Sequence, residues 1–169
     1  MNNFSLSKDQ KSALMTVYGL INEWNIKNPN EKIPWILSGS TSLVLQGVKI
    51  IPHDIDILTD KTWAKQLDLL LSDYCIKKSE FSGTEKYRSY FGVYMIQWIK
   101  VEVMGEMQYR QQDNTRSPVN QTHPTFFCVF QENEFPILSL EHELREYIAM
   151  WRMDTAQKIK EKLAICDWK

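Results

Sequence analysis

Long hydrophobic runs and closely spaced cysteines are both missing from this sequence of 169 residues. No apolar run approaches the roughly 20 residues that a helix needs to cross a bilayer, so we expect no membrane-spanning segment. The opening residues, MNNFSLSKDQ, lack the basic start and apolar stretch of a signal peptide. The three cysteines, Cys75, Cys128 and Cys166, are widely spaced and odd in number, which predicts free thiols rather than a disulfide framework or a CxxC zinc site. Together these absences predict a soluble protein of the reducing cytoplasm.

An excess of positive charge is absent as well. Lysine and arginine number 20 against 21 aspartate and glutamate, which leaves a formal net charge of −1. A dedicated duplex-binding protein normally carries a basic excess, so we expect no strong binding to duplex nucleic acid. A small anionic ligand held by a few local charges is compatible with this balance.

What the sequence does contain is typical of one globular domain. Hydrophobic residues make up 43% and charged residues 24%, and we find no internal repeat, low-complexity tract or Pro/Gly-rich linker. We therefore expect a single domain over residues 1–169, with a core at about 33–138 and a helical part at 139–169.

Hydrophobic periodicity and turn residues predict the order of elements. A capping box of Ser7 and Gln10 opens a helix at 7–26, and Gly47 ends a short helix at 41–46. A third helix follows a cap at Thr59 or Asp60, and the chain is helical again, in one or two pieces, from residue 139. Strands are expected at 33–37, 53–58, 75–78, 86–94, 97–104, 125–131 and 135–138. Two hairpins and a long surface loop at 108–124 complete an α+β fold, in which helices flank a mixed sheet.

Two aspartates interrupt the strand at 53–58. Side chains alternate along a strand, so Asp54 and Asp56 project to one face while Ile55 and Ile57 enter the core. Two carboxylates held this close repel each other unless a cation lies between them or one takes a proton. Hard oxygen ligands of this kind suit Mg²⁺ or Mn²⁺, which usually share their remaining positions with water and phosphates. By itself, however, an Asp-x-Asp pair also fits a solvated strand edge.

A Gly-Ser turn just before these aspartates favours the metal interpretation. Glycine allows close backbone approach to a phosphate, and a helix that starts at Ser40 presents free N–H groups to an anion. Gly39 and Ser40 would then contact a triphosphate while the aspartates supply its metal. The P-loop and the Gly-x-Ser-x-Gly motif are both absent, since the latter would need glycine at Ser42.

The order of these motifs resembles the signature of the nucleotidyltransferase superfamily, which includes DNA polymerase beta and the aminoglycoside and lincosamide nucleotidyltransferases. Gly39-Ser40 is followed after thirteen residues by Asp54-Ile55-Asp56-Ile57, and WIKVEVMGEM offers the later third carboxylate, Glu102. Small bacterial nucleotidyltransferase-like proteins are similar over residues 33–160. The match is looser near the end, where Met153 stands in place of the lysine of an R-x-K-D motif.

The resemblance implies a polymerase beta palm-like fold and a role for each motif. Asp54, Asp56 and Glu102 would hold Mg²⁺ or Mn²⁺, with Glu102 alternatively serving as the base for the acceptor. Gly39 and Ser40 would bind the β- and γ-phosphates. Further cationic help is expected from three basic residues, Arg88, Arg152 and Lys158. His53, next to the first aspartate, is interpreted as structural.

The implied reaction transfers a nucleoside monophosphate from an NTP to a hydroxyl on a small molecule, a protein or an RNA. Two alternatives stay open at this point. One is an antitoxin- or toxin-type enzyme that modifies a protein or a tRNA, with a possible protein partner. The other is a non-catalytic nucleotide-binding module, which the three acids disfavour because clustered carboxylates without a metal are costly.

Overall fold

A computed structural model describes residues 5–110, 114–118 and 126–166. Its helices are α1 (Lys8–Lys27), α2 (Gly39–Leu45), α3 (Lys61–Leu70), a 3₁₀ turn (Ser72–Tyr74), α4 (Leu140–Ala149) and α5 (Met153–Cys166). Its strands are β1 (Ile36–Ser38), β2 (Asp54–Thr59), β3 (Cys75–Gly83), β4 (Tyr87–Ile96), β5 (Ile99–Arg110), β6 (Arg116–Pro118), β7 (Phe126–Phe130) and β8 (Asn133–Ile137). These elements form one mixed sheet with helices packed on it, which confirms the predicted α+β class.

The sheet has the order β3-β4-β5-β2-β1-β8-β7 among the described residues, and β6 pairs with β5 outside this path. The β2–β5 and β1–β8 pairs are parallel, and the remaining pairs are antiparallel. Both predicted hairpins, β4–β5 and β7–β8, are confirmed. The central parallel pair matters most for function, because it places two strands far apart in sequence side by side.

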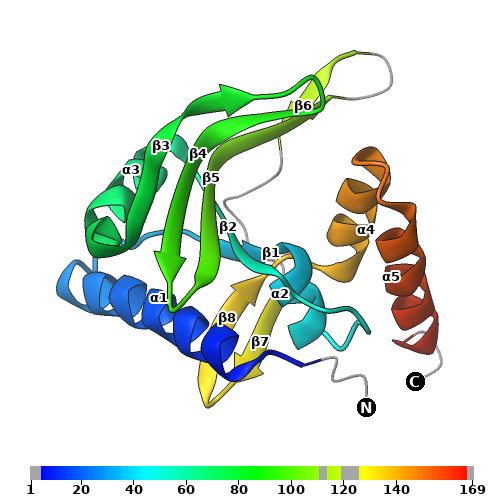
Figure 1. Ribbon diagram of the computed structural model, residues 1–169, viewed down its shortest axis with the longest axis horizontal. Coiled ribbons are helices and arrows are strands. Elements are labelled where there is room, and N and C mark those ends of the chain that lie inside the picture. Colours follow the sequence, from blue (N-terminus) through cyan, green and yellow to red (C-terminus); the bar gives the residue numbers. More distant parts are fainter. Residues whose placement is uncertain (1–4, 111–113, 119–125, 167–169) are drawn as a thin grey trace.

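Helices α1 and α3 cover one face of the sheet (Figure 1). The main core forms there, where Leu14, Val17 and Ile21 of α1 meet Ile55 and Ile57 of β2. The predicted capping box is present, since the Ser7 Oγ accepts from the Gln10 N–H and the Gln10 side chain accepts from the Ser7 N–H. Asp60, the second of the two expected caps, begins α3 by accepting from the Trp63 N–H.

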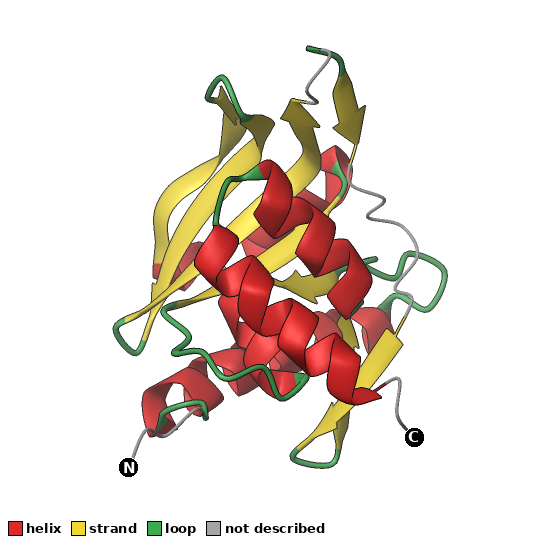
Figure 2. Cartoon of the chain, turned by 90° about the vertical axis from the view of Figure 1, so that its right-hand side faces the viewer, coloured by secondary structure: helices red, strands yellow, loops and turns green. Residues whose placement is uncertain are grey.

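Helices α4 and α5 lie on the other side of the sheet and cross in front of the strands (Figure 2). They share a smaller core with α2, built from residues such as Leu43, Tyr147 and Ile159. The helical end of the chain is thus in two pieces, and Asp154 lies in the first turn of α5. No described helix has the length and apolar character needed to cross a membrane.

Several boundaries differ from the sequence-based expectation. The helix α2 begins at Gly39 rather than residue 41, because Gly39 adopts a left-handed φ of 68° that turns β1 directly into the helix. The expected loop at 108–124 is partly strand, since β5 continues to Arg110 and Arg116–Pro118 pairs back onto it. Residues 111–113 and 119–124 of that loop lie outside the described residues. Cys75 and Cys128 are free thiols, as expected.

Candidate active site

Three carboxylates meet on the parallel strands β2 and β5. The register pairs Asp56 with Glu102 across the two strands, and Asp54 precedes Asp56 by two residues on the same face. The alternate residues Ile55 and Val101 are fully buried in the core. One oxygen from each of the three acids lies within 4.8 Å of the others. We call Asp54, Asp56 and Glu102 the acid triad.

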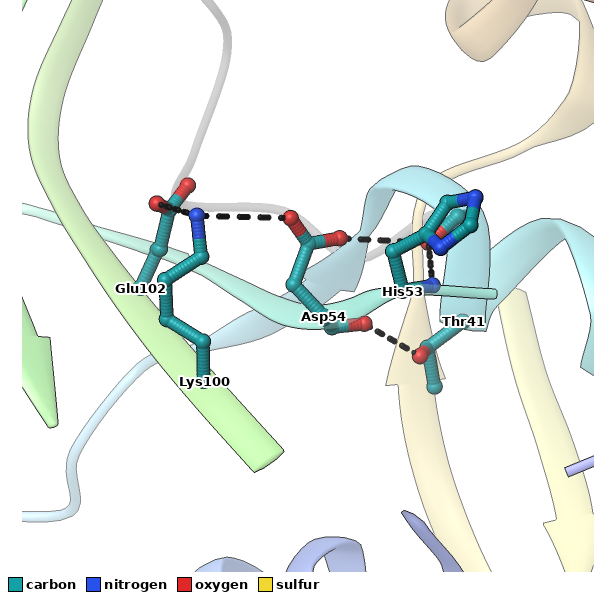
Figure 3. Close-up of polar contacts among 6 residues, drawn as sticks. Thr41, His53, Asp54, Lys100 and Glu102 are labelled. Atoms are coloured by element: carbon teal, nitrogen blue, oxygen red, sulfur yellow. Dashed lines mark hydrogen bonds and ion pairs between the residues drawn. The ribbon is translucent and has the colours of Figure 1, made fainter. Parts of the chain in front are cut away.

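A lysine bridges two members of the acid triad (Figure 3). The Nζ of Lys100 lies 2.7 Å from Oε1 of Glu102 and 3.8 Å from Oδ2 of Asp54. The hydrogen bond to Glu102 is the main reason that the pKa of Lys100 is raised. This lysine was not among the residues predicted from the sequence.

The Gly-Ser turn fixes the aspartates from the other side. Ser40 Oγ donates to Oδ1 of Asp54 over 3.2 Å, and Thr41 Oγ1 donates to the backbone oxygen of Asp54 over 2.6 Å. Gly39 lies against Asp56 so closely that an added Cβ would come within 2.0 Å of Oδ2 of Asp56. The glycine is therefore required by the aspartate as well as by its own left-handed backbone.

The ionised form of Asp56 is disfavoured at its place in the acid triad. Removal from water is the main reason that the pKa of Asp56 is raised well above its ordinary value. The neighbouring charges of Asp54 and Glu102 raise this pKa further. A bound cation would stabilise the ionised form of Asp56 that burial and the neighbouring charges disfavour.

The donor chemistry of the acid triad fits a divalent metal ion. All three side chains offer carboxylate oxygens, which Mg²⁺ and Mn²⁺ prefer over nitrogen or sulfur ligands. Three acids leave positions open for water and for phosphate oxygens, as Mg²⁺ sites in phosphoryl-transfer proteins do. The acid triad could therefore hold the metal that the sequence predicts.

A cleft of about 510 Å³ opens over the acid triad. One side is formed by β3, β4 and the turn between them, through residues including Thr84, Tyr87 and Phe91, and another side by α4 and the turn into α5. Its volume falls within the range of small-molecule sites in proteins. The acid triad thus lies in a cleft of the size that small-molecule ligands occupy.

Two further acids line the cleft from α4. Glu143 is fully buried, and its Oε1 accepts the Gly39 N–H over 2.9 Å. Its Oε2 is also buried and has no hydrogen-bond partner among the described residues. Glu146 is 8% exposed and accepts the hydroxyl of Tyr109 over 3.0 Å. Burial raises the pKa of Glu146 to about 7 and is the largest cause of the raised pKa of Glu143.

The aminoglycoside-2''-adenylyltransferase family model matches residues 25–160, which include the acid triad, the Gly-Ser turn and α4. The chain belongs to this family. It is accordingly a nucleotidyltransferase, as the sequence motifs predicted. Among curated proteins, no sequence matches this chain.

Solved structures agree with the family. A candidate nucleotidyltransferase from Thermotoga maritima, TM1012, is 34% identical over 95% of this chain and 96% of its own, with a TM-score of 0.76. The lincosamide antibiotic adenylyltransferase LnuA, solved with lincomycin, is 13% identical over 92% of this chain and 98% of its own, with a TM-score of 0.55. ANT(2'')-Ia, solved with adenylyl-2''-tobramycin, is 9% identical over 90% and 88%, with a TM-score of 0.56. The last two likenesses concern the fold alone.

The other residues predicted for the site are only partly gathered there. Ser40 and Arg152 line the cleft, and so does His53, which had been interpreted as structural. Arg88 does not line it, because it alternates on β4 with the cleft-lining Tyr87 and Ser89 and so faces the other way. Lys158 is exposed on α5 and is also absent from the lining. Phosphate contacts through Arg88 and Lys158 are therefore unsupported by this arrangement.

Sequence reasoning missed Lys100, Glu143 and Glu146. A signal for the two glutamates was present, because they lie three residues apart on the same stripe of α4 as the buried Leu140 and Tyr147. Acids on the apolar stripe of a helix indicate a polar cavity beneath it. Lys100 offered a weaker signal, namely its position two residues before Glu102 on one face of a strand.

Proposed function

We propose that this nucleotidyltransferase transfers a nucleoside monophosphate from an NTP to a hydroxyl group of an amine-bearing small molecule. The observation that carries the proposal is the acid triad at the floor of a cleft whose α4 side adds two buried glutamates. The acid triad supports metal-dependent phosphoryl transfer, and the two buried glutamates support an amine-bearing acceptor.

The residues around the acid triad have separable tasks in this proposal. Asp54, Asp56 and Glu102 would hold Mg²⁺ or Mn²⁺, which supplies charge neutralisation on the phosphates when it is bound. Arg152 is a cleft-lining cation available to phosphate oxygens, whereas Ser40 lines the cleft with its hydroxyl group donated to Asp54. The Gly39 N–H donates a hydrogen bond to Glu143 and is therefore not assigned to phosphate binding. The contribution of Gly39 is its missing side chain, which leaves room for the carboxylate of Asp56.

The reaction is an in-line displacement at the α-phosphorus. The acceptor oxygen forms a bond to this phosphorus, the bond to the bridging oxygen of pyrophosphate breaks, and the hydroxyl proton passes to a base. Glu102, on β5 beside the aspartate pair of β2, is our choice for that base. If Glu102 instead completes the metal site, its negative charge is needed there as well.

The α4 side of the cleft favours a cationic acceptor. Glu143 and Glu146 are buried carboxyls, and a buried carboxylate is stabilised by a paired cation. An ammonium group of the acceptor would supply that cation while its neighbouring hydroxyl points to the acid triad. The family description names an aminoglycoside reaction, which is consistent with such an acceptor.

Our proposal keeps the cytoplasmic location and the small acceptor that the sequence favours. The free thiols of Cys75 and Cys128 support the cytoplasmic location, where NTPs are available. The net charge of −1 supports a small acceptor over duplex nucleic acid.

The test uses an NTP labelled at the α-phosphate, Mg²⁺ or Mn²⁺, and three acceptors: tobramycin, lincomycin and a tRNA mixture. We expect label on an amine-bearing small molecule and release of pyrophosphate. Glu102→Gln should reduce transfer by about 10²–10⁴-fold, because an amide cannot accept the proton, while NTP binding stays of similar strength. The control is Glu106→Gln, an exposed glutamate on the same strand, which should transfer at the wild-type rate.

Each part of the proposal can fail separately. Label found only on tRNA would contradict the small-molecule acceptor. Wild-type transfer by Glu102→Gln would remove Glu102 from the mechanism. No label on any acceptor with either metal would contradict transfer to these acceptor classes.

A further inference from the structure

Lys100 contacts two of the three acids that could hold a metal ion. Its Nζ contacts Oε1 of Glu102 at 2.7 Å and faces Oδ2 of Asp54 at 3.8 Å, so it stands between two of the three acids (Figure 3). The strand register produces this arrangement, since Lys100 is paired with Asp54 and precedes Glu102 on the same face of β5.

The close contact engages a carboxylate oxygen of Glu102, one of the three acids that could bind a metal ion. A carboxylate oxygen offers lone pairs in a limited set of directions, and the ammonium takes one of them on Glu102. A metal ion drawn to all three acids is repelled by the positive charge of this ammonium group. Lysine and metal therefore compete for the same place.

The Lys100 side chain can also move away from the acid triad. Its side chain is 45% exposed, whereas those of Asp54 and Glu102 are 25% and 19% exposed. A flexible four-carbon stem carries its ammonium, which is strongly hydrated and can turn to solvent without moving the backbone. By contrast, the acids are fixed by β2, β5 and the hydroxyl groups of Ser40 and Thr41.

We propose that Lys100 occupies the cation position of the acid triad in the metal-free protein, and that a divalent ion binds by displacing it. This inference rests on the metal site of the proposed function. Lys100 is then a positioning residue: it holds Asp54 and Glu102 together before the metal arrives, and it sets the metal concentration needed to fill the site. A divalent ion prevails because it carries twice the charge and binds all three acids at once.

The test is a titration with Mn²⁺ and no nucleotide, following the free ion by electron paramagnetic resonance. Lys100→Met keeps the length of the side chain and removes its charge. We expect this variant to bind Mn²⁺ about two- to fivefold more tightly than wild type, the range typical of one partly exposed ion pair. Lys100→Arg retains the charge and should bind no more tightly than wild type. The matched control is Lys78→Met, an exposed lysine on β3, which should leave Mn²⁺ affinity unchanged.

A thermal melt provides the second readout. In EDTA, Lys100→Met should melt below wild type, because the acids lose their only bridging lysine among the described ion pairs. Saturating Mn²⁺ should reduce that difference. If Lys100→Met fails to fold, Lys100→Gln serves for both measurements.

Equal or weaker Mn²⁺ binding by Lys100→Met would overturn the inference while leaving the metal site in place. Absence of Mn²⁺ binding from both wild type and variant would overturn the inference together with the metal site itself. The transfer assay with labelled NTP separates these results from a failure of the proposed reaction, because it measures a product rather than the ion.

Discussion

Gly39 shows how one residue governs the geometry of the acid triad. Its left-handed φ of 68° starts α2, its N–H donates to Glu143, and its Cα lies beside the carboxylate of Asp56. An alanine Cβ at this position would lie 2.0 Å from Oδ2 of Asp56. Any larger residue must therefore move Asp56 or the turn.

We expect Gly39→Ala to reduce nucleotidyl transfer by about 100-fold or more, because a shift of about 1 Å in a reacting group has an effect of this size. The left-handed backbone adds a cost of roughly 1–2 kcal/mol to the free energy of folding. Steady-state transfer and urea unfolding measure the two effects. Gly19→Ala, on an exposed face of α1 with no atom near its Cβ, is the control and should be stabilising. Full activity in Gly39→Ala would show that Asp56 tolerates displacement.

Glu146 predicts a pH dependence of stability in the metal-free protein. Its pKa is about 7 in the native state against 4.5 in the unfolded chain, because burial disfavours the charge. Between these values the native state binds more protons than the unfolded state, so stability decreases as pH rises from about 4.5 to 7. The ionised form costs the native state about 3 kcal/mol at most.

Replacing Glu146 by glutamine removes this cost and keeps an oxygen for the Tyr109 hydroxyl. We expect Glu146→Gln to be more stable than wild type at pH 8 and to lose most of that advantage at pH 5. Urea unfolding in EDTA at both pH values measures the difference. A difference that does not vary with pH would contradict the raised pKa.

At the scale of elements, the sheet separates stability from chemistry. The isoleucines of β2 face α1 and the main core, while the aspartates of the same strand face the cleft. Changes on the α1 side should therefore alter the free energy of unfolding without reaching the acid triad.

Ser7→Ala tests this separation at the start of α1. Loss of the capping box should destabilise the protein by about 1 kcal/mol, because the Gln10 N–H loses its acceptor. Transfer by the folded variant should equal that of wild type. Denaturant unfolding measures the free energy of unfolding, and the labelled-NTP assay measures the transfer rate. A marked loss of transfer would mean that α1 and the cleft are coupled.

At the scale of the whole molecule, charge is distributed unevenly. The net charge is only −1, yet five carboxyls line or border one cleft: Asp54, Asp56, Glu102, Glu143 and Glu146. Such a site attracts cations and repels a free triphosphate, so the nucleotide should bind together with its metal.

We therefore expect ATP to raise the melting temperature by several degrees with Mg²⁺ and much less with EDTA. A ligand at 100 times its Kd stabilises the native state by about 2.7 kcal/mol, and 1 kcal/mol shifts Tm by roughly 2–4 °C for a domain of this size. The double variant Asp54→Asn/Asp56→Asn should show no difference between the two conditions. Equal shifts with and without Mg²⁺ in wild type would contradict the metal assignment.

The local pattern of residues determined much of the architecture. Alternation around Asp54-Ile55-Asp56 predicted which side chains enter the core, and the Ser7 capping box predicted where α1 begins. These predictions were confirmed because they depend on neighbours within a few residues, where backbone geometry alone decides the outcome. The third acid, Glu102, was identified only through its resemblance to a family signature, since nothing local ties residue 102 to residue 54.

The contents of the cleft depended on tertiary structure. Pairing of β2 with β5 brought Lys100 to the acid triad, and packing of α4 beside the Gly-Ser turn brought Glu143 onto Gly39. Alternation along β4 turned Arg88 away from the cleft, and the close approach of Asp56 explains the glycine at position 39 without a phosphate contact. Sequence alone thus determined which faces of each element are polar, whereas only strand order and helix packing decided which polar faces meet, because those contacts join residues far apart in the chain.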